Sequence, residues 1–212
     1  MKTILCYGDS LTWGYNADGS GRLAFEDRWP SVLQAGLGNE ALVIAEGLNG
    51  RTTIFDDWAA GADRNGARTL PTILSTHSPL DLIIIMLGTN DLKPVLCGRA
   101  HGSRQGMERL VVIVRGHDYP FDVTPPHILI VAPPELCETA NADFAGVYDG
   151  ALTESAKLCP LYRQVAEKMG CAFFDAGTVA RTHPADGVHL DRENTRAIGQ
   201  GLLPHVSSLL GL

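Results

Sequence analysis

Five short apolar runs recur along the chain and constrain its fold more than any other feature. They are TILCY (3–7), ALVIAE (41–46), DLIIIML (81–87), HILIVAP (127–133) and CAFFDA (171–176). Their apolar residues are consecutive instead of alternating with polar ones, which is typical of strands buried on both faces. Strands of this kind occur in parallel sheets that helices cover on each side.

Segments with helical spacing separate these runs, at residues 27–38, 65–77, 103–117, 151–170 and 191–212. Pro71 limits the second segment to a helix start or a kink, and Pro160 either kinks the fourth or begins its second half. Asp191 is a suitable N-cap for the last one. The alternation of strand and helix predicts a three-layer α/β/α sandwich with a five-stranded parallel sheet and right-handed crossovers.

Composition narrows the class of protein. The chain has 212 residues with no linker, repeat or low-complexity tract, so we expect one domain over 1–212. A net charge of -7 argues against nucleic acid or an anionic membrane as partner, and no run is apolar enough to span a bilayer. The start of the chain is interpreted as a strand and not a signal peptide. The five cysteines show no C-x-x-C pairing, which predicts reduced thiols in a cytoplasmic protein.

Polar residues follow four of the predicted strands. These segments are Gly8–Asp9–Ser10, GLNGRTT (47–53), GTND (88–91) and, just past the fifth strand, DGVH (186–189). Ligands of open parallel sheets bind beyond the carboxyl ends of the strands, so the four segments are expected at one edge.

The residue types in these segments match acyl transfer on serine. That chemistry needs a hydroxyl, an imidazole, a carboxylate that orients the imidazole, and donors for the oxyanion. Each residue alone has an ordinary explanation: Ser10 or Asn90 as a helix cap, His189 as a structural histidine, Asp186 as a turn residue. Their joint placement favours catalysis. The short spacing lets Asp186 hold one ring nitrogen of His189 while the other faces Ser10.

On these motifs the sequence resembles the SGNH (GDSL-type) hydrolases. GDSLTWG matches the first conserved block of that superfamily, GLNGRTT the second, GTND the third and DGVHL the fifth, in the right order. Together with LIIIMLGTND and FFDAG, they look most like the bacterial arylesterase and acyltransferase subgroup. The resemblance implies the flavodoxin-like SGNH hydrolase fold.

The resemblance also assigns roles to residues. It implies Ser10 as nucleophile, His189 as general base and then acid, and Asp186 as the group that orients His189. The oxyanion hole would combine the backbone N–H groups of Ser10 and Gly50 with the side-chain amide of Asn90.

Further residues have expected supporting roles. Trp13 either packs under the loop or walls the substrate pocket, and we assign it with Thr89 to substrate binding. Asp9 and Asp91 are interpreted as loop organisers. Two long loops, 92–102 and 134–150, have no assigned role, and three residues of the second are candidates to close the pocket: Phe144, Val147 and Tyr148.

We therefore expect a serine esterase that needs no cofactor or metal. It would hydrolyse short-chain carboxylic esters, such as phenyl or nitrophenyl acetate, through an acyl-enzyme, with acyltransferase or perhydrolase side activity. A carbohydrate acetylesterase with the same triad is the alternative. Relatives in the subgroup form homo-oligomers, often octamers, and the resemblance implies a homo-oligomer here. The sequence does not identify the physiological ester.

Three alternatives of other classes are weaker. A metal-dependent hydrolase would use His183, Asp186 and His189, but no second cluster supplies ligands. A nucleotide or flavin module would need a glycine-rich phosphate motif that GDSLTWG lacks. A non-catalytic ligand-binding module would have no need to keep all four catalytic positions.

Overall fold

The computed structural model describes residues 1–212, apart from the side chain of Asp122. Its centre is a five-stranded parallel sheet in the order β2-β1-β3-β4-β5. The strands are β1 (Lys2–Gly8), β2 (Ala41–Gly47), β3 (Leu82–Met86), β4 (His127–Ala132) and β5 (Ala172–Asp175). All five predicted strands are present, and the order is the flavodoxin-like one.

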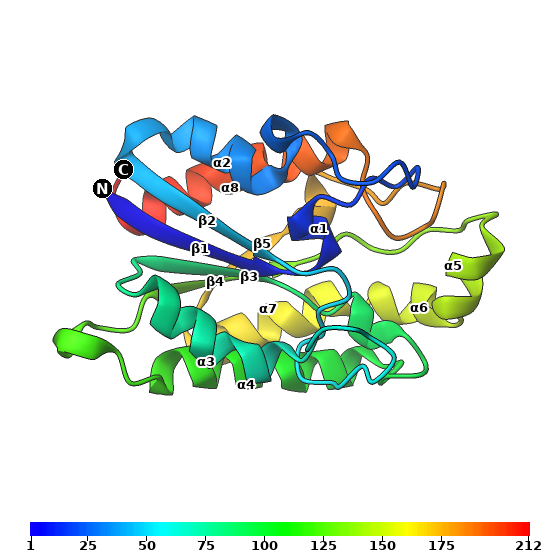
Figure 1. The fold of residues 1–212 in the computed structure, drawn as a ribbon, viewed down its shortest axis with the longest axis horizontal. Helices are drawn as coiled ribbons and strands as arrows, with labels where there is room; N and C mark the ends of the chain where they lie inside the picture. The colour runs from blue at the N-terminus through cyan, green and yellow to red at the C-terminus, as the bar shows by residue number, and fades with distance from the viewer.

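Helices cover both faces of the sheet (Figure 1). The long ones are α2 (Trp29–Leu37), α3 (Gly66–His77), α4 (Ala100–Gly116), α7 (Leu158–Met169) and α8 (Arg192–Leu210). Helices α2 and α8 lie on one face, and α3, α4 and α7 lie on the other. The predicted three-layer sandwich is confirmed.

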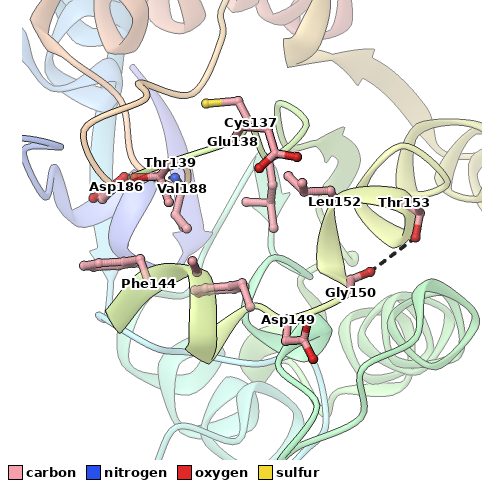
Figure 2. Close-up of a pocket in the computed structure, with 14 residues that line it drawn as sticks. Cys137, Glu138, Thr139, Phe144, Asp149, Gly150, Leu152, Thr153, Asp186 and Val188 are labelled. Carbon is pink, nitrogen blue, oxygen red and sulfur yellow. Dashed lines mark hydrogen bonds between the residues drawn. The ribbon is translucent and has the colours of Figure 1, made fainter. Parts of the chain in front are cut away.

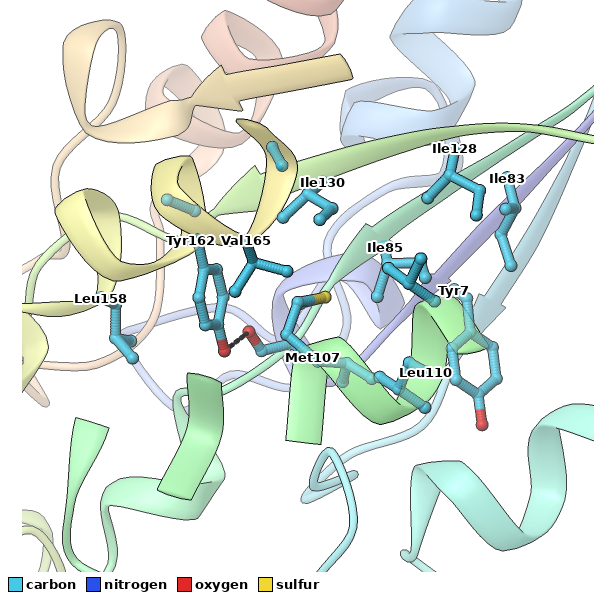
Figure 3. Packing of buried hydrophobic residues seen from close by; sticks show 14 of the residues in the cluster. Tyr7, Ile83, Ile85, Met107, Leu110, Ile128, Ile130, Leu158, Tyr162 and Val165 are labelled. Atoms are coloured by element: carbon cyan, nitrogen blue, oxygen red, sulfur yellow. Dashed lines mark hydrogen bonds between the residues drawn. The ribbon is translucent and has the colours of Figure 1, made fainter. Parts of the chain in front are cut away.

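The alternation of side chains along each strand divides the core in two. Leu5 and Tyr7 of β1 face the layer of α3, α4 and α7, while Ile4 and Cys6 face α2 and α8. Figure 3 shows the first of these clusters, where the isoleucines of β3 and β4 pack against Met107, Leu110 and Val165. Both faces of the central strands are therefore apolar, which explains the consecutive apolar residues in the sequence.

At Pro160 the structure confirms one of the two expected alternatives, because a second helix begins there, whereas at Pro71 it differs from the expectation. The segment 151–170 is divided into α6 (Ala151–Ser155) and α7, and Pro160 lies in the first turn of α7. Proline has no N–H to donate to the carbonyl four residues earlier. In the first turn of a helix the N–H groups have no such partner, so proline is tolerated there and a new helix begins. By contrast, α3 continues through Pro71, because burial of Leu70 and Leu74 holds its two halves on the same core.

The two long loops also contain helical structure. Helix α4 begins at Ala100, inside the segment 92–102, and the segment 134–150 contains the short helix α5 (Ala142–Val147). A short helix, α1 (Ser10–Trp13), follows β1 directly. Helices α1, α5 and α6 lie beyond the carboxyl ends of the strands, far from both termini (Figure 1).

Two further features bear on the sequence analysis. All five cysteines are unpaired, as predicted. Among the described residues, no helix combines the length and the apolar character that crossing a bilayer requires.

Candidate active site

The turn between β1 and α1 places Ser10 at the edge of the sheet. A side chain at Gly8 would come within 2.0 Å of the Thr12 hydroxyl and 2.9 Å of the Met86 carbonyl, so this turn requires glycine. Asp9 is the N-cap of α1, and its Oδ1 accepts a hydrogen bond from the N–H of Leu11 at 3.0 Å. The strand therefore ends abruptly, and Ser10 is the first residue of the helix.

A second turn, just before α8, carries Asp186 and His189. Asp186 Oδ1 accepts hydrogen bonds from the backbone N–H groups of Val188 and His189, at 2.9 and 2.8 Å. Its other oxygen, Oδ2, lies 2.6 Å from His189 Nδ1. The turn requires Gly187, which has φ 77° and where a Cβ would lie 2.5 Å from the carbonyl of Cys137.

The two turns meet. His189 Nε2 lies 2.9 Å from Ser10 Oγ, so carboxylate, ring and hydroxyl form one continuous chain of hydrogen bonds. All three residues are buried, with exposed fractions of 7% for Ser10, 2% for Asp186 and 7% for His189. The structure thus brings together the three residues that sequence analysis selected from opposite ends of the chain.

The electrostatics of this chain favour an ionised carboxylate. Burial raises the pKa of Asp186, but the hydrogen bonds from His189 and Val188 and the nearby imidazole outweigh it, so the pKa lies below its ordinary value. Two rings enclose the imidazole: Tyr15, with a centroid separation of 4.2 Å, and Phe144, edge-on at 5.7 Å. The ring of His189 therefore packs against two aromatic side chains.

Ser10, Gly50 and Asn90 line the same cavity, and each carries a candidate donor for the oxyanion. The N–H groups of Ser10 and Gly50 make no hydrogen bond within the described part of the chain. Asn90 Nδ2 donates to the carbonyl of Arg51 at 3.1 Å and, at the longer distance of 3.4 Å, to Asp9 Oδ2. Tyr148 donates to Asn90 Oδ1 at 3.2 Å, which fixes the orientation of the amide.

Two buried carboxyl groups support these donors. Asp91 accepts hydrogen bonds from the N–H of Thr53 at 2.9 Å and from its hydroxyl at 2.6 Å, so it joins the segment after β3 to the segment after β2. Burial raises the pKa of Asp91 to about 7 and that of Asp9 to about 6. These contacts agree with the prediction that both residues organise loops.

A cavity of about 290 Å³ opens above Ser10. Its wall is formed by Ser10, Tyr15, Asn49, Gly50, Arg64, Asn90, Lys93, Asp143, Phe144, Val147, Tyr148 and His189. Neither Trp13 nor Thr89 belongs to this wall in the described structure. Trp13 instead stacks with Arg22, whose guanidinium lies 4.5 Å from the indole centroid, and Thr89 is 4% exposed. Their contact with substrate stays a prediction that this geometry does not support.

A second cavity, of about 360 Å³, lies on the far side of α5 (Figure 2). Phe144 and Tyr148 border both cavities, while Ser10 and His189 border only the first. Helix α5 is therefore the partition between them.

The residues considered as metal ligands do not form a metal site. Within the described side chains, no group of three or more His, Cys, Asp or Glu is placed to hold a metal ion. Both ring nitrogens of His189 already face Asp186 and Ser10.

A buried serine, histidine and aspartate joined in this order, beside unpaired backbone donors at the end of a parallel sheet, are typical of hydrolases that act on acyl groups. The sequence matches the GDSL-like lipase/acylhydrolase family over residues 6–196. The chain belongs to this family, has the SGNH hydrolase fold, and is an esterase or acylhydrolase.

Solved structures support this assignment. A carbohydrate acetylesterase family member from Sinorhizobium meliloti is 64% identical, with complete coverage of both chains and a TM-score of 0.99. The aryl esterase of M. smegmatis is 41% identical, with 99% of this chain and 100% of that chain covered and a TM-score of 0.93. A second carbohydrate acetylesterase from Sinorhizobium meliloti is 38% identical, with the same coverage and a TM-score of 0.92. No curated protein sequence matches the chain.

Sequence reasoning missed several residues of the site. Tyr15 and Arg64 border the cavity from segments without a recognisable motif, and only the folded chain shows their position. Lys93 had a signal, because it follows Asn90 by three residues, about one helical turn. Arg51 is buried and donates to the carbonyl of Gly8 at 2.8 Å, so it braces the end of β1.

Proposed function

We propose that the protein is a serine esterase that works through an acyl-enzyme on Ser10. The observation that carries this proposal is the continuous contact from Asp186 through His189 to Ser10, at 2.6 and 2.9 Å. A hydroxyl in this position can transfer its proton to the imidazole as it attacks.

The proposed acylation step uses these contacts. Ser10 Oγ attacks the ester carbonyl carbon and its proton passes to His189 Nε2. The tetrahedral intermediate collapses, the bond to the alcohol oxygen breaks, and His189 returns the proton to the departing alkoxide. The pKa of Asp186 lies below its ordinary value, so this carboxyl group is ionised and stabilises the imidazolium that forms between these steps.

The oxyanion would be bound by the N–H groups of Ser10 and Gly50 and by Asn90 Nδ2. The two backbone donors have no other acceptor within the described chain, so they are available at no cost. The contact of Asn90 with Asp9 is longer than an ordinary N–H···O bond, which leaves that amide hydrogen available to the oxyanion. Each donor of this kind contributes about 2.7–4 kcal/mol to the transition state.

Deacylation repeats the sequence with water. His189 takes a proton from water, the hydroxide adds to the acyl carbon, and the carboxylic acid leaves as Ser10 recovers its proton. No step needs a cofactor or a metal.

Short-chain carboxylic esters are the proposed substrates. The 290 Å³ cavity suits a small acyl group, and its walls include the aromatic rings of Tyr15, Phe144 and Tyr148. We propose aryl esters such as phenyl acetate as one class, in line with the aryl esterase of M. smegmatis. Acetylated carbohydrates are the second class, favoured by the 64% identity to a carbohydrate acetylesterase family member.

Three finer proposals accompany this function. We propose that residues 1–212 act as one catalytic domain in the cytoplasm, that the chain forms a homo-oligomer, and that the acyl-enzyme also transfers its acyl group to alcohols or peroxide. A monomeric mass in light scattering would contradict the second. The third fails if added alcohol does not divert product from acid to ester.

Pre-steady-state kinetics test the acyl-enzyme directly. With para-nitrophenyl acetate we expect a burst of nitrophenol equal to the concentration of active sites, followed by slower turnover. Ser10→Ala should remove both phases while leaving the folded structure intact. Turnover by Ser10→Ala at the wild-type rate would contradict the proposal.

A further inference from the structure

Two cationic side chains, Arg64 and Lys93, line the cavity above Ser10. Each of the two residues contacts one of the proposed oxyanion donors. The Arg64 side chain packs on Gly50, where a Cβ would lie 2.8 Å from its Cδ, Nε and Cζ atoms. Lys93 follows Asn90 by one turn, and its N–H donates to the carbonyl of Asn90 at 3.3 Å. Both side chains therefore begin next to a proposed oxyanion donor.

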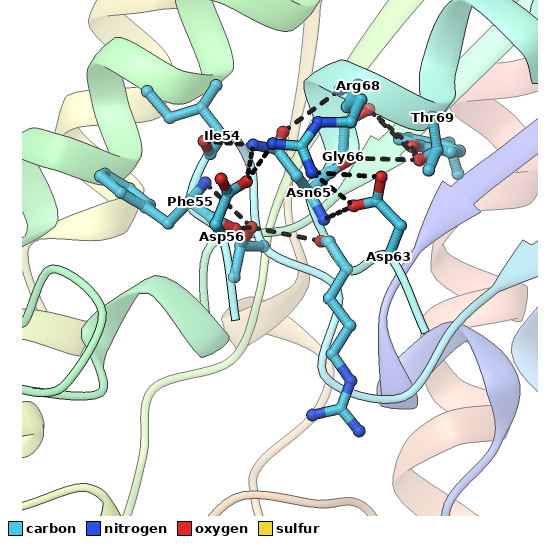
Figure 4. A network of polar contacts seen from close by, with 11 residues as sticks. Ile54, Phe55, Asp56, Asp63, Asn65, Gly66, Arg68 and Thr69 are labelled. Carbon is cyan, nitrogen blue, oxygen red and sulfur yellow. Dashed lines mark hydrogen bonds and ion pairs between the residues drawn. The ribbon is translucent and has the colours of Figure 1, made fainter. Parts of the chain in front are cut away.

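The loop that carries Arg64 is held firmly. The carbonyl of Arg64 accepts a hydrogen bond from the N–H of Thr52 at 2.9 Å, and its Nη1 lies 2.9 Å from Asp57 Oδ2. Figure 4 shows the polar network that braces the same loop, formed by Ile54, Asp56, Asp63, Asn65 and Arg68. Arg64 is thus positioned before any ligand arrives, which lowers the entropic cost of binding.

Within the described part of the chain, Lys93 has no carboxylate partner. Among the described side chains no acidic group forms an ion pair with it, and its nearest aromatic neighbour is Tyr148, whose centroid lies 5.5 Å from Nζ. Burial and the charge of Arg64 lower the pKa of Lys93, while the carboxylates of Asp57 and Asp9 act in the opposite direction. Asp57 pairs with Arg64, so one positive charge in the cavity wall stays without an ion-pair partner.

The wall of the same cavity also includes an acidic side chain. Asp143 also borders the cavity, and it lies on α5 next to Phe144, whose ring contacts His189. His189 gives its proton to the departing alcohol, so the alcohol lies on this acidic side. The acyl chain, the remaining substituent of the ester carbon, then points away from His189.

Resting on the proposed function, we propose that Lys93 and Arg64 form a subsite for an anionic acyl group. The preferred substrate is then a half-ester of a short dicarboxylic acid, such as a succinyl ester. Ser10 takes the acyl group, the alcohol leaves with the proton from His189, and water releases the dicarboxylate. The distal carboxylate of the acyl group then forms an ion pair with the ammonium of Lys93.

Paired substrates measure this preference. Phenyl hydrogen succinate carries the anion on the acyl chain, and phenyl methyl succinate is its neutral counterpart; phenol release is followed for both, with spontaneous hydrolysis subtracted. We expect kcat/KM to favour the anionic ester by roughly tenfold to a hundredfold, as for hydrogen bonds to charged groups. The preference should shrink in about 0.5 M NaCl, because salt screens the attraction.

Variants assign the preference to Lys93. Lys93→Met should lower the anionic-to-neutral ratio by about tenfold, and Lys93→Arg should retain most of it. Lys168→Met, which removes an exposed lysine from α7, should leave the ratio unchanged. Because the readout is a ratio, a general loss of activity cancels.

Several results would overturn the proposal. One is a wild-type ratio of one or less, and another is a ratio that does not change in Lys93→Met because both esters slow equally, which would assign the lysine to the oxyanion. If Lys93→Met does not fold, the proposal is contradicted when the anionic-to-neutral ratio of the wild type does not change with salt.

A second pair locates the charge. In para-acetoxybenzoate the anion is on the leaving group, and its methyl ester is neutral. We expect no preference for the anion here, because Asp143 lies on that side. A preference in this pair alone would also overturn the proposal. Turnover of phenyl acetate through Ser10 would continue in all these cases, so failure of the subsite and failure of the esterase function are distinguishable.

Discussion

The two turns that carry Ser10 and His189 border the same cavity as helix α5, but they are built differently. Ser10, Asp186 and His189 are buried and joined by hydrogen bonds of 2.6–2.9 Å. Helix α5 buries none of its side chains fully and is tied to the site by the contact of Tyr148 with Asn90. On the proposed function, the reaction therefore depends on the buried, hydrogen-bonded turns at the sheet edge, while ester selectivity depends on the more exposed helix α5.

The largest effect is expected at Asp186. Asp186→Asn should lower kcat by about 10⁴-fold, because an amide no longer holds His189 in the required tautomer or stabilises its charged form. Steady-state kinetics with phenyl acetate measure it, and Asp118→Asn, at an exposed position far from the site, is the matched control. A loss of less than tenfold would mean that the buried turn does not carry the chemistry.

The proposed oxyanion donor Asn90 has the second-largest expected effect. Asn90→Ala should reduce kcat by about 10²–10³-fold with little change in KM, since the amide acts mainly on the charged intermediate. Separate determination of kcat and KM decides this. If KM rises while kcat stays constant, Asn90 binds substrate and not the transition state.

The buried carboxyl of Asp91 gives a pH dependence of stability. Its pKa of about 7 lies above the ordinary value of 3.8, so the native state retains a proton that the unfolded state loses, and stability falls as pH rises between about 4 and 7. From pH 5 to pH 8, wild type should therefore lose about 2–3 kcal/mol relative to Asp91→Asn.

Urea unfolding at the two pH values measures this loss, with exposed Asp118→Asn as the control. Curves for wild type and Asp91→Asn that stay parallel with pH would show that the carboxyl is not protonated in the native state.

The smallest effect sharpens the contrast at α5. Phe144→Ala should change the ratio of kcat/KM for an aryl ester to that for an acetylated sugar by about tenfold or less, because it removes one edge-on ring contact. Competition between the two esters gives the ratio. A loss of 10³-fold on both esters would place α5 in the catalytic machinery and remove the distinction drawn above.

Much of the fold could be predicted because burial on both faces leaves a clear pattern. The consecutive apolar residues in 81–87 indicate a strand that is buried on both faces. The alternation of such strands with helices then predicts the three-layer α/β/α sandwich. The helices were less certain. Pro71 and Pro160 carry the same local signal, but tertiary packing decides that one lies inside a helix and the other near its start.

The candidate site was also predictable only where short sequence motifs mark its residues. Ser10, Asp186, His189, Gly50 and Asn90 lie in motifs at strand ends, so sequence alone brings them to one edge. Arg64 and Tyr15 could not be found in this way, because their place depends on how loops fold back over the sheet. Thr89 and Trp13 show the opposite case. Both lie within the sequence motifs, but neither lines the cavity.

Covalent labelling tests the central claim most directly. Treatment with an organophosphonate, followed by peptide mapping by mass spectrometry, should find one label per chain on Ser10, and His189→Ala should slow the labelling by about 10³-fold or more. A label on another residue, or labelling of His189→Ala at the wild-type rate, would contradict the account.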